Sequence, residues 1–110
     1  MGEFVKRDIV VIPFPFSDLS QNKRRPALVL TDLNGDDILL CQITSQHSND
    51  IFALTLDSKK IESGMLPVDS FIRPLRIFTA DKNIILHKAG KITPELMDKV
   101  IDAIIFALKQ

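Results

Sequence analysis

A predicted β-hairpin constrains this chain more than any other stretch. Residues 27–30 and 38–43 are two runs of aliphatic and β-branched side chains, and Asn34-Gly35-Asp36-Asp37 stands between them. Asn-Gly tolerates the positive φ angles of a tight turn, so this spacing predicts two antiparallel strands joined by a hairpin. Closing the hairpin brings Arg25, at the start of one strand, close to Thr44, at the end of the other.

Arg25 and Thr44 together make a pair of donors that suits a phosphate group. A guanidinium donates a planar, bidentate pair of N–H groups, and a threonine hydroxyl adds one neutral donor. The alternative interpretation is an ordinary surface arginine beside a strand-end threonine. Composition by itself favours that alternative.

The rest of the chain also predicts short strands. Residues 8–12 form the first strand, which Pro13 ends, and the polar stretch that follows up to Lys23 is a candidate functional loop. A charged connection runs through residues 59–62, and Pro74 marks a bend or an edge. The later strands are predicted at residues 51–56, 69–79 and 84–87. Short strands with frequent turns favour a small barrel over a parallel sheet, in a single domain over residues 1–110.

The chain ends in a predicted amphipathic helix that begins at Thr93. Thr93 can cap the helix, and Pro94 suits the first helical position. The apolar arc of the helix consists of Leu96, Met97, Val100, Ile101, Ile104, Ile105 and Leu108. This arc is explained by packing on the barrel. Phe106 instead projects among polar residues, which indicates either a partner surface or a partly covered surface ring.

Charge and composition narrow the classes of partner. The chain carries 14 basic and 14 acidic side chains, so its formal net charge is zero. This balance excludes a uniformly basic protein and requires any RNA contact to use a local patch. The one cysteine, Cys41, lies in an apolar run and is expected to be a buried, inert thiol. The chain shows no signal peptide and no apolar run of membrane length, which predicts a cytoplasmic protein without a membrane partner.

Five motifs, in order along nearly the whole chain, resemble the MazF/PemK-like toxin family. They are DIVVIPFPFSD at residues 8–18, KRRPALVL at 23–30, QITS at 42–45, GMLPVDS at 64–70 and Thr-Pro-Glu at 93–95. The resemblance implies a mainly β (α+β) fold, a small SH3-like β-barrel with a C-terminal α-helix. It also implies a metal-independent endoribonuclease that cuts single-stranded RNA (mRNA) as the toxin of a toxin–antitoxin system.

The resemblance and the chemistry of the side chains together predict the site residues. Arg25 would stabilise charge on the phosphoryl oxygens, and Thr44 would hold one of those oxygens. His47 is the third predicted catalytic residue, because an imidazole can move the proton that a guanidinium does not release. The alternative for His47 is a solvated loop histidine. The predicted substrate-binding residues are Lys23, Arg24, Arg73, Arg76 and Phe16.

Two positions depart from the family pattern. Some members carry an acidic residue shortly after the position of Arg73, where this chain continues with Pro74, which argues against an acid–base pair built on Arg73. The Gly that usually precedes the first-strand Asp is replaced by Arg7, with an expected effect on the local bend only. His87 is interpreted as structural. The two histidines lack neighbours at ligand spacing, so neither a metal site nor a cofactor is predicted.

Two classes of function remain open. One is the endoribonuclease toxin, with an antitoxin protein covering its basic groove. The other is a non-catalytic barrel that binds nucleic acid or inhibits a protein such as gyrase, because related toxins with that target share the barrel. The Arg25–Thr44 pair favours cleavage. The resemblance also implies a homodimer, and Phe106, Leu66 and Pro67 are apolar groups that a partner would cover.

Overall fold

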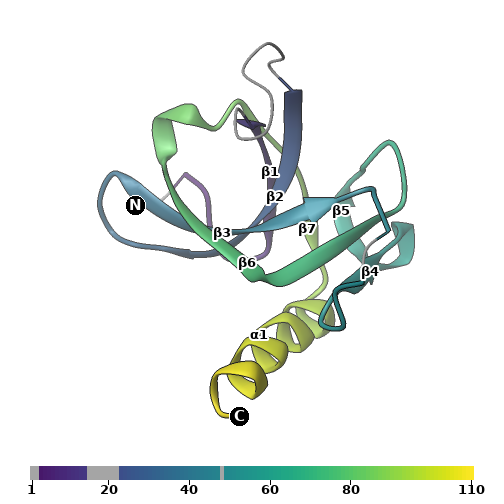
Figure 1. Cartoon of the computed structure of the whole chain (residues 1–110). Helices are drawn as coiled ribbons and strands as arrows, with labels where there is room; N and C mark the ends of the chain where they lie inside the picture. The colour runs from purple at the N-terminus through teal and green to yellow at the C-terminus, as the bar shows by residue number, and fades with distance from the viewer. Residues whose placement is uncertain (1–2, 15–22, 48) are drawn as a thin grey trace.

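The computed structural model describes residues 3–14, 23–47 and 49–110. In these residues the chain forms seven β-strands, two short 3-10 helices and one α-helix (Figure 1). Their order is β1 (Asp8–Phe14), β2 (Lys23–Asp32), β3 (Asp37–Thr44), β4 (Leu54–Leu56), η1 (Ser58–Lys60), β5 (Ile61–Gly64), β6 (Ser70–Asp81), η2 (Lys82–Ile84), β7 (His87–Ile92) and α1 (Pro94–Leu108). The loop predicted between the first two strands falls on residues 15–22, outside the described residues.

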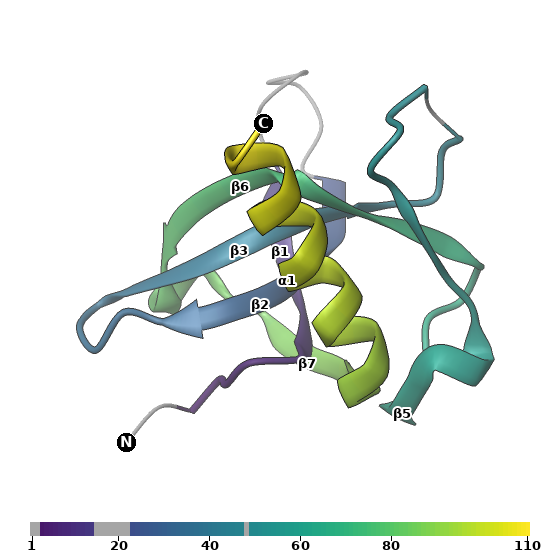
Figure 2. The same cartoon turned by 90° about the horizontal axis from the view of Figure 1, so that it is seen from below.

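The described strands form one antiparallel sheet that curls into a nearly closed barrel. Their order across the sheet is β4-β6-β3-β2-β1-β7-β5. The consecutive strands β1, β2 and β3 are neighbours in the middle, and β6 and β7 flank them. Figures 1 and 2 show the strongly bent sheet with α1 lying across one side of it. The predicted small β-barrel with a C-terminal helix is therefore confirmed.

The predicted hairpin is also confirmed, and it is longer than its two apolar runs. β2 and β3 pair antiparallel from Ala27↔Gln42 to Asp32↔Ile38. Asn34 takes a positive φ of 63° in the connecting turn, and its N–H donates to Asp32 Oδ1 at 2.8 Å. This register brings the residues before Ala27 and those after Gln42 to the same end of the hairpin.

The strand predicted at residues 51–56 is wrong over its first half. Asp50 turns the chain there, because its side chain accepts a hydrogen bond from the Phe52 N–H (2.9 Å) and its carbonyl accepts one from the Ala53 N–H (3.2 Å). Only β4 is extended. The charged connection that follows contains η1 and a further strand, β5, which the sequence pattern did not predict. β5 has only a half-buried Ile61 facing inward, which is too weak an alternation to recognise.

The last strand was predicted at residues 84–87, and this is wrong as well. Asp81 caps η2, since its side chain accepts a hydrogen bond from the Asn83 N–H at 2.8 Å. A short acidic side chain that satisfies a backbone donor locally favours a turn over an extended run. The strand therefore begins later, as β7, and His87 is its first residue rather than its last.

Two of the three prolines in the described strands, Pro13 and Pro74, lie where a regular ladder hydrogen bond is not required. Pro13 continues β1 rather than ending it, because beyond Val11 the described partner of this strand is β2 alone. Pro74 lies in β6, where the register against β3 shifts between Cys41 and Gln42. The bend predicted at Pro74 is confirmed by this shift.

The first half of α1 packs against the barrel. Thr93 Oγ1 accepts a hydrogen bond from the Leu96 N–H at 3.3 Å and Pro94 lies in the first turn, as predicted. Leu96, Met97 and Val100 are buried in the larger core cluster, together with side chains from several strands. Among the described residues, no helix is both long and apolar enough to cross a bilayer.

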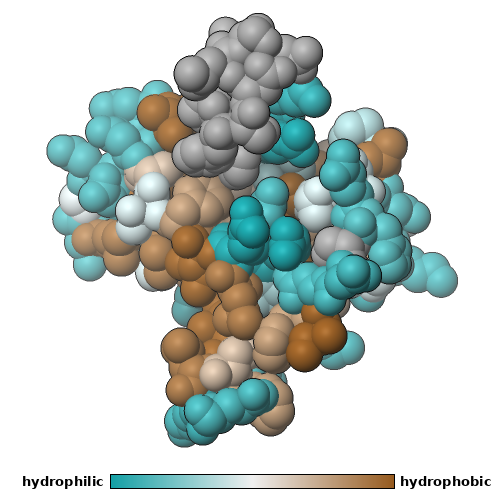
Figure 3. All heavy atoms as spheres, viewed as in Figure 1, coloured by the Kyte–Doolittle hydropathy of each residue, from teal (hydrophilic) through white to brown (hydrophobic). Residues whose placement is uncertain are grey.

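The second half of α1 leaves apolar side chains at the surface. Ile105 and Leu108 were predicted to pack on the barrel, but they are 45% and 78% exposed, because the end of the helix extends away from the sheet (Figure 1). Phe106 is 62% exposed, and Leu75 and Ile77 on β6 are exposed too. Figure 3 shows apolar atoms gathered over the helix and reaching the sheet above it.

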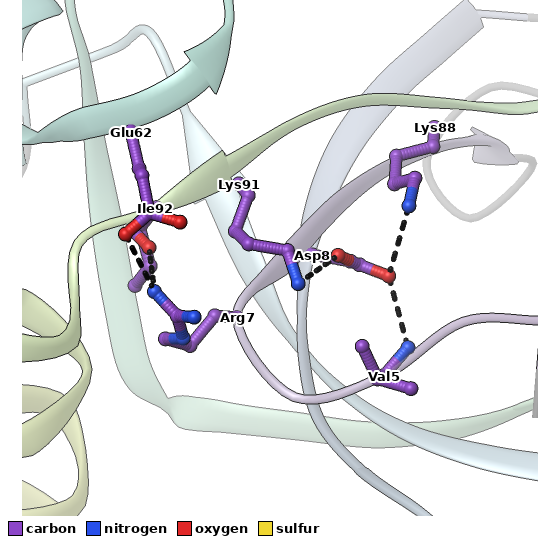
Figure 4. A network of polar contacts seen from close by, with 7 residues as sticks. All are labelled: Val5, Arg7, Asp8, Glu62, Lys88, Lys91 and Ile92. Atoms are coloured by element: carbon purple, nitrogen blue, oxygen red, sulfur yellow. Dashed lines mark hydrogen bonds and ion pairs between the residues drawn. The ribbon is translucent and has the colours of Figure 1, made fainter.

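A buried carboxylate ties the start of β1 to β7. Asp8 is fully buried, and its Oδ2 accepts a hydrogen bond from the Val5 N–H at 2.9 Å. Lys88 Nζ lies 3.7 Å from Oδ2, and Lys91 Nζ lies 3.3 Å from Oδ1 (Figure 4). Residues three apart point to opposite faces of a regular strand. A register shift between β1 and β7 is what lets both lysines face the same carboxylate.

Arg7 adds a second tie at the same place. It has a φ of +80°, a conformation that glycine adopts most readily, and it stands where the resembling family has Gly. Its Nη1 donates to the Ile92 carbonyl at 3.0 Å and to Glu62 Oε1 at 3.1 Å (Figure 4). The substitution therefore affects more than the local bend, since the side chain links β1 to both β5 and β7.

We expect Asp8→Ala to lower the free energy of unfolding by about 2–3 kcal/mol, because the Val5 N–H and two lysines lose their partner together. Chemical denaturation measures the change. Lys99→Gln, on the exposed face of α1, is the control and should stay within about 0.5 kcal/mol of wild type. A loss for Asp8→Ala no larger than this control would show that the carboxylate does not hold β1 to β7.

Candidate functional site

A cavity of about 580 Å³ lies between five segments of the barrel. Its described lining comes from β1, the start of β2, the end of β3 with the two residues after it, the connection between β5 and β6 with the first residue of β6, and the start of β7. The hairpin register explains the central part of this arrangement. The start of β2 and the end of β3, which the hairpin brings together, both line the cavity.

Arg25 and Thr44 both line this cavity. Arg25 is half-buried on β2, opposite Ile12 of β1. Thr44 is buried at the end of β3, and its Oγ1 accepts a hydrogen bond from the Gln46 N–H at 3.1 Å. Accepting that bond uses a lone pair and leaves the hydroxyl hydrogen to be donated. The two side chains can therefore act on one anionic group in the cavity.

The charge around the cavity has one sign. Lys23 and Arg24 line it beside Arg25. No aspartate or glutamate is present among the lining residues that the structure describes. The protein is neutral as a whole, so this grouping of cations gives the cavity a local positive charge, the kind that a phosphate-bearing chain requires.

An apolar lip borders the same cavity. Met65, Leu66, Pro67 and Val68 line it, and Met65 and Val68 are 76% and 55% exposed. The lip starts at Gly64, which has a φ of +76° and lies so close to β7 that a Cβ would meet the Ala89 carbonyl oxygen at 2.2 Å. Leu66 and Pro67, the two residues that were expected to be covered by a partner, thus line the same cavity as the cations. Apolar side chains beside cations can contact the faces of nucleic-acid bases.

His87 is a cavity residue that the sequence interpretation missed. It was interpreted as structural, because the last strand was expected to end at this residue among apolar neighbours. The structure begins β7 there, and His87 is exposed and lines the cavity with Arg25 and Thr44. The sequence feature that could have indicated this is Asp81, which ends β6 and caps η2, so that the next strand begins only at His87.

The remaining predicted residues lie outside the described lining. The His47 ring packs edge-on against Phe71, with ring centroids 5.3 Å apart, and His47 is absent from that lining. Arg76 is exposed on β6 and Arg73 also lies away from the cavity. Phe16 falls outside the residues that the structure describes.

Arg73 has an acidic partner after all, from a different segment. Its Nε donates to Asp50 Oδ2 at 3.0 Å. Burial raises the pKa of the Asp50 carboxyl, but the Phe52 N–H and the Arg73 guanidinium outweigh burial, so the net pKa is lowered. The pair fastens the segment before β4 to β6.

Two other observations bear on the chemistry. Cys41 is buried, as predicted, and burial raises the pKa of its thiol to about 12, so the thiol stays protonated at neutral pH. Within residues 3–14, 23–47 and 49–110, no three His, Cys, Asp or Glu side chains gather closely enough to hold a metal ion.

Solved structures share this fold at low sequence identity. The chain is similar to a MazE–MazF complex from Deinococcus radiodurans, with 18% identity, 97% of each chain covered and a TM-score of 0.77. It is similar to a mycobacterial endoribonuclease in complex with its cognate antitoxin, with 14% identity, 96% of this chain and 95% of that chain covered, and a TM-score of 0.75. The Mycobacterium tuberculosis toxin MazF-mt6 gives 17% identity, 94% and 97% coverage, and a TM-score of 0.73.

Among curated proteins, none matches the chain. A family comparison is decisive, because it spans nearly all of the sequence. Residues 6–108 match the PemK-like, MazF-like toxins of type II toxin–antitoxin systems, and the chain therefore belongs to this family.

Proposed function

We propose that this protein is the toxin of a type II toxin–antitoxin system and cuts single-stranded RNA as an endoribonuclease. One observation carries the proposal: Arg25 and Thr44 line one cavity whose described charged side chains are all cationic. Membership of the toxin family supports the same activity, and relatives of the same fold include a protein named as an endoribonuclease. The proposed substrate is mRNA and the proposed location is therefore the cytoplasm. We also propose that residues 1–110 form a single domain.

The proposed cleavage uses a nucleophile that RNA already contains. The 2′-hydroxyl next to the scissile phosphate attacks phosphorus, the bond to the 5′-oxygen breaks, and a 2′,3′-cyclic phosphate forms. Arg25 stabilises the charge that develops on the phosphoryl oxygens, and Thr44 donates to one of them. Neither side chain is a good base, because a guanidinium stays charged and a hydroxyl is a weak acceptor of protons.

The other predicted residues are assigned to RNA binding around this centre. Lys23 and Arg24 contact backbone phosphates at the cavity. Arg73 and Arg76 would contact flanking nucleotides, and Arg73 would have to exchange its bond to Asp50 for one to RNA. His47 stays a predicted proton shuttle, which would have to leave its contact with Phe71 to reach the cavity.

The proposed protein partner is an antitoxin that covers the cationic cavity. A mycobacterial endoribonuclease of the same fold was solved in complex with its cognate antitoxin, which supports a partner of this kind. An acidic segment of the antitoxin would occupy the place of RNA phosphates. Its apolar side chains would contact the lip at residues 65–68.

We expect Arg25→Ala to lower the rate of the chemical step by about 10²–10³-fold, the usual scale for one preorganised donor to a developing oxyanion. Thr44→Ala should cost less, because it removes one neutral donor. Arg25→Lys is the matched control: it keeps the charge, loses the planar fork and should fall between wild type and Arg25→Ala. Single-turnover cleavage of single-stranded RNA measures all three rates.

These variants should stay folded, since Arg25 lies near one end of its strand and Thr44 at the end of its own. A folded Arg25→Ala protein that cuts at the wild-type rate would remove Arg25 from the mechanism. An absence of any cleavage by wild type, combined with RNA binding, would favour the non-cutting barrel.

We expect cleavage to continue in EDTA and to leave a 2′,3′-cyclic phosphate and a 5′-hydroxyl, because the substrate supplies the nucleophile and Arg25 supplies the positive charge. Mass spectrometry of the products of a mixed-sequence single-stranded RNA identifies both ends. Substituting a 2′-deoxynucleotide at the mapped cleavage site should abolish cutting there. Activity that EDTA removes and magnesium restores contradicts the mechanism.

We expect the protein to form a homodimer through the apolar surface made by Leu75, Ile77, Ile105, Phe106 and Leu108. Phe106→Glu should then yield monomers at micromolar concentration and leave the barrel folded, because Phe106 is 62% exposed. Lys99→Glu, on the polar side of the same helix, is the control and should stay dimeric. Light scattering decides the point, and a monomer mass for wild type would refute the dimer.

A further inference from the structure

The cleavage reaction needs a proton acceptor, and the cavity offers one. Lys23, Arg24 and Arg25 are cations without an accepting lone pair, and Thr44 is a weak base. Histidine is the side chain whose ordinary titration falls between about pH 5 and 8. Among the described residues that line the cavity, His87 is the one imidazole, and no carboxylate is present beside it.

The backbone holds His87 close to Arg25 through one shared strand. Val11 of β1 is paired with His87 of β7 on one side and with Pro26 of β2 on the other. The Leu86 N–H donates to the Val11 carbonyl at 2.8 Å, which secures the chain just before His87. Two strand spacings separate β7 from β2, about 10 Å in all. His87 and Arg25 both line the cavity that borders these strands.

The register that places His87 depends on the Asp8 network. Asp8 is paired with Lys91, and the register shift that follows sets Val11 opposite His87. Lys88, the residue after His87, is directed to the Asp8 carboxylate (Figure 4). Neighbouring side chains of a strand point to opposite faces, so fixing Lys88 on Asp8 turns His87 toward the cavity.

We propose that His87 is the general base of this toxin, a role that rests on the proposed RNA cleavage. The neutral imidazole nitrogen takes the proton from the 2′-hydroxyl while the 2′-oxygen forms its bond to phosphorus. The bond from phosphorus to the 5′-oxygen breaks, and that oxygen takes a proton from water. The imidazolium returns its proton to the hydroxide so formed, and the reaction ends with no net change in protons.

The other described ionisable groups that line the two cavities beside His87 ordinarily do not change charge between about pH 5 and 8. Arg25, Arg24 and Lys23 line the same cavity as His87. A second cavity of about 590 Å³ shares His87 and is lined by Glu3, Lys82 and Lys88. Lysine and arginine keep their charge between about pH 5 and 8, and glutamate ordinarily titrates below that range. A change in rate across this range is therefore expected from an imidazole, and the chain has two histidines, His87 and His47.

The test is a pH–rate profile of single-turnover cleavage. A mixed-sequence RNA first maps a cleaved site, and a short oligonucleotide with that site is the substrate. The wild-type rate should fall as the pH decreases from about 8 to 5, because the base becomes protonated. His87→Ala should be slower by about 10²–10⁴-fold and should lose this fall in rate. Added imidazole should restore part of the activity of His87→Ala in proportion to its neutral form.

Two controls separate chemistry from binding and folding. An oligonucleotide with a 2′-deoxynucleotide at the cleavage site cannot react, and its Kd should be the same within about threefold for wild type and His87→Ala, since most backbone affinity comes from the cations. His87→Gln, which keeps a polar side chain at this exposed position, should behave like His87→Ala. Both variants should unfold thermally like wild type.

The outcomes are distinct. A wild-type rate and profile in His87→Ala overturns the proposal, and so does a fall in rate that disappears in His47→Gln while it persists in His87→Ala. If the wild-type rate instead falls as the pH rises, and His87→Ala loses that fall, His87 acts as an acid. This result also overturns the proposal. If wild type cuts RNA and Arg25→Ala does not, such results reject His87 alone. If wild type cuts no RNA, the proposed function and this role fail together.

Discussion

The buried carboxylate of Asp8 is the interaction on which the rest of the barrel depends. Burying a charge is costly unless it is paired and hydrogen-bonded. Asp8 Oδ2 accepts a hydrogen bond from the Val5 N–H, and the ammonium groups of Lys88 and Lys91 form ion pairs with the carboxylate, while Oδ1 accepts no hydrogen bond among the described residues. These partners come from opposite ends of the sequence. The carboxylate therefore holds β7 against β1. β7 in turn forms one wall of the cavity and pairs with β5.

Arg7 shows how the same joint tolerates a residue that the family pattern does not favour. A positive φ costs a residue with a Cβ about 1 kcal/mol or more relative to glycine. Its guanidinium offsets that strain by bonding to the Ile92 carbonyl and to Glu62. A backbone hydrogen bond joins the same two residues, because the Arg7 carbonyl accepts from the Ile92 N–H at 3.0 Å. The strained backbone of Arg7 and the hydrogen bonds that offset it therefore lie at the same point, where the chain entering β1 meets β5 and β7.

A neutral chain obtains a cationic site by placing its acids elsewhere. In the described part of the chain, Asp8, Asp32, Asp50 and Glu62 are each paired with a lysine or arginine outside the cavity. Lys82 and the Asn34 N–H lower the pKa of the Asp32 carboxyl. These pairs fix turns and strand ends, and the cavity receives Lys23, Arg24 and Arg25 without a described acid beside them. Local segregation of charge, rather than net charge, makes the site.

The sequence by itself determined what depends on neighbours along the chain. Asn34 in the turn, the cap at Thr93 and the apolar runs of the hairpin carry their own geometry, so the hairpin, the helix start and the meeting of Arg25 with Thr44 in one cavity could all be predicted. Only the tertiary structure decided the place of His87 and the partner of Arg73. The place of His87 depends on the register of β7 against β1, which a buried carboxylate and a strand bulge accompany, and the partner of Arg73 depends on a turn at Asp50 far away in sequence. Such contacts leave no periodic pattern in the chain.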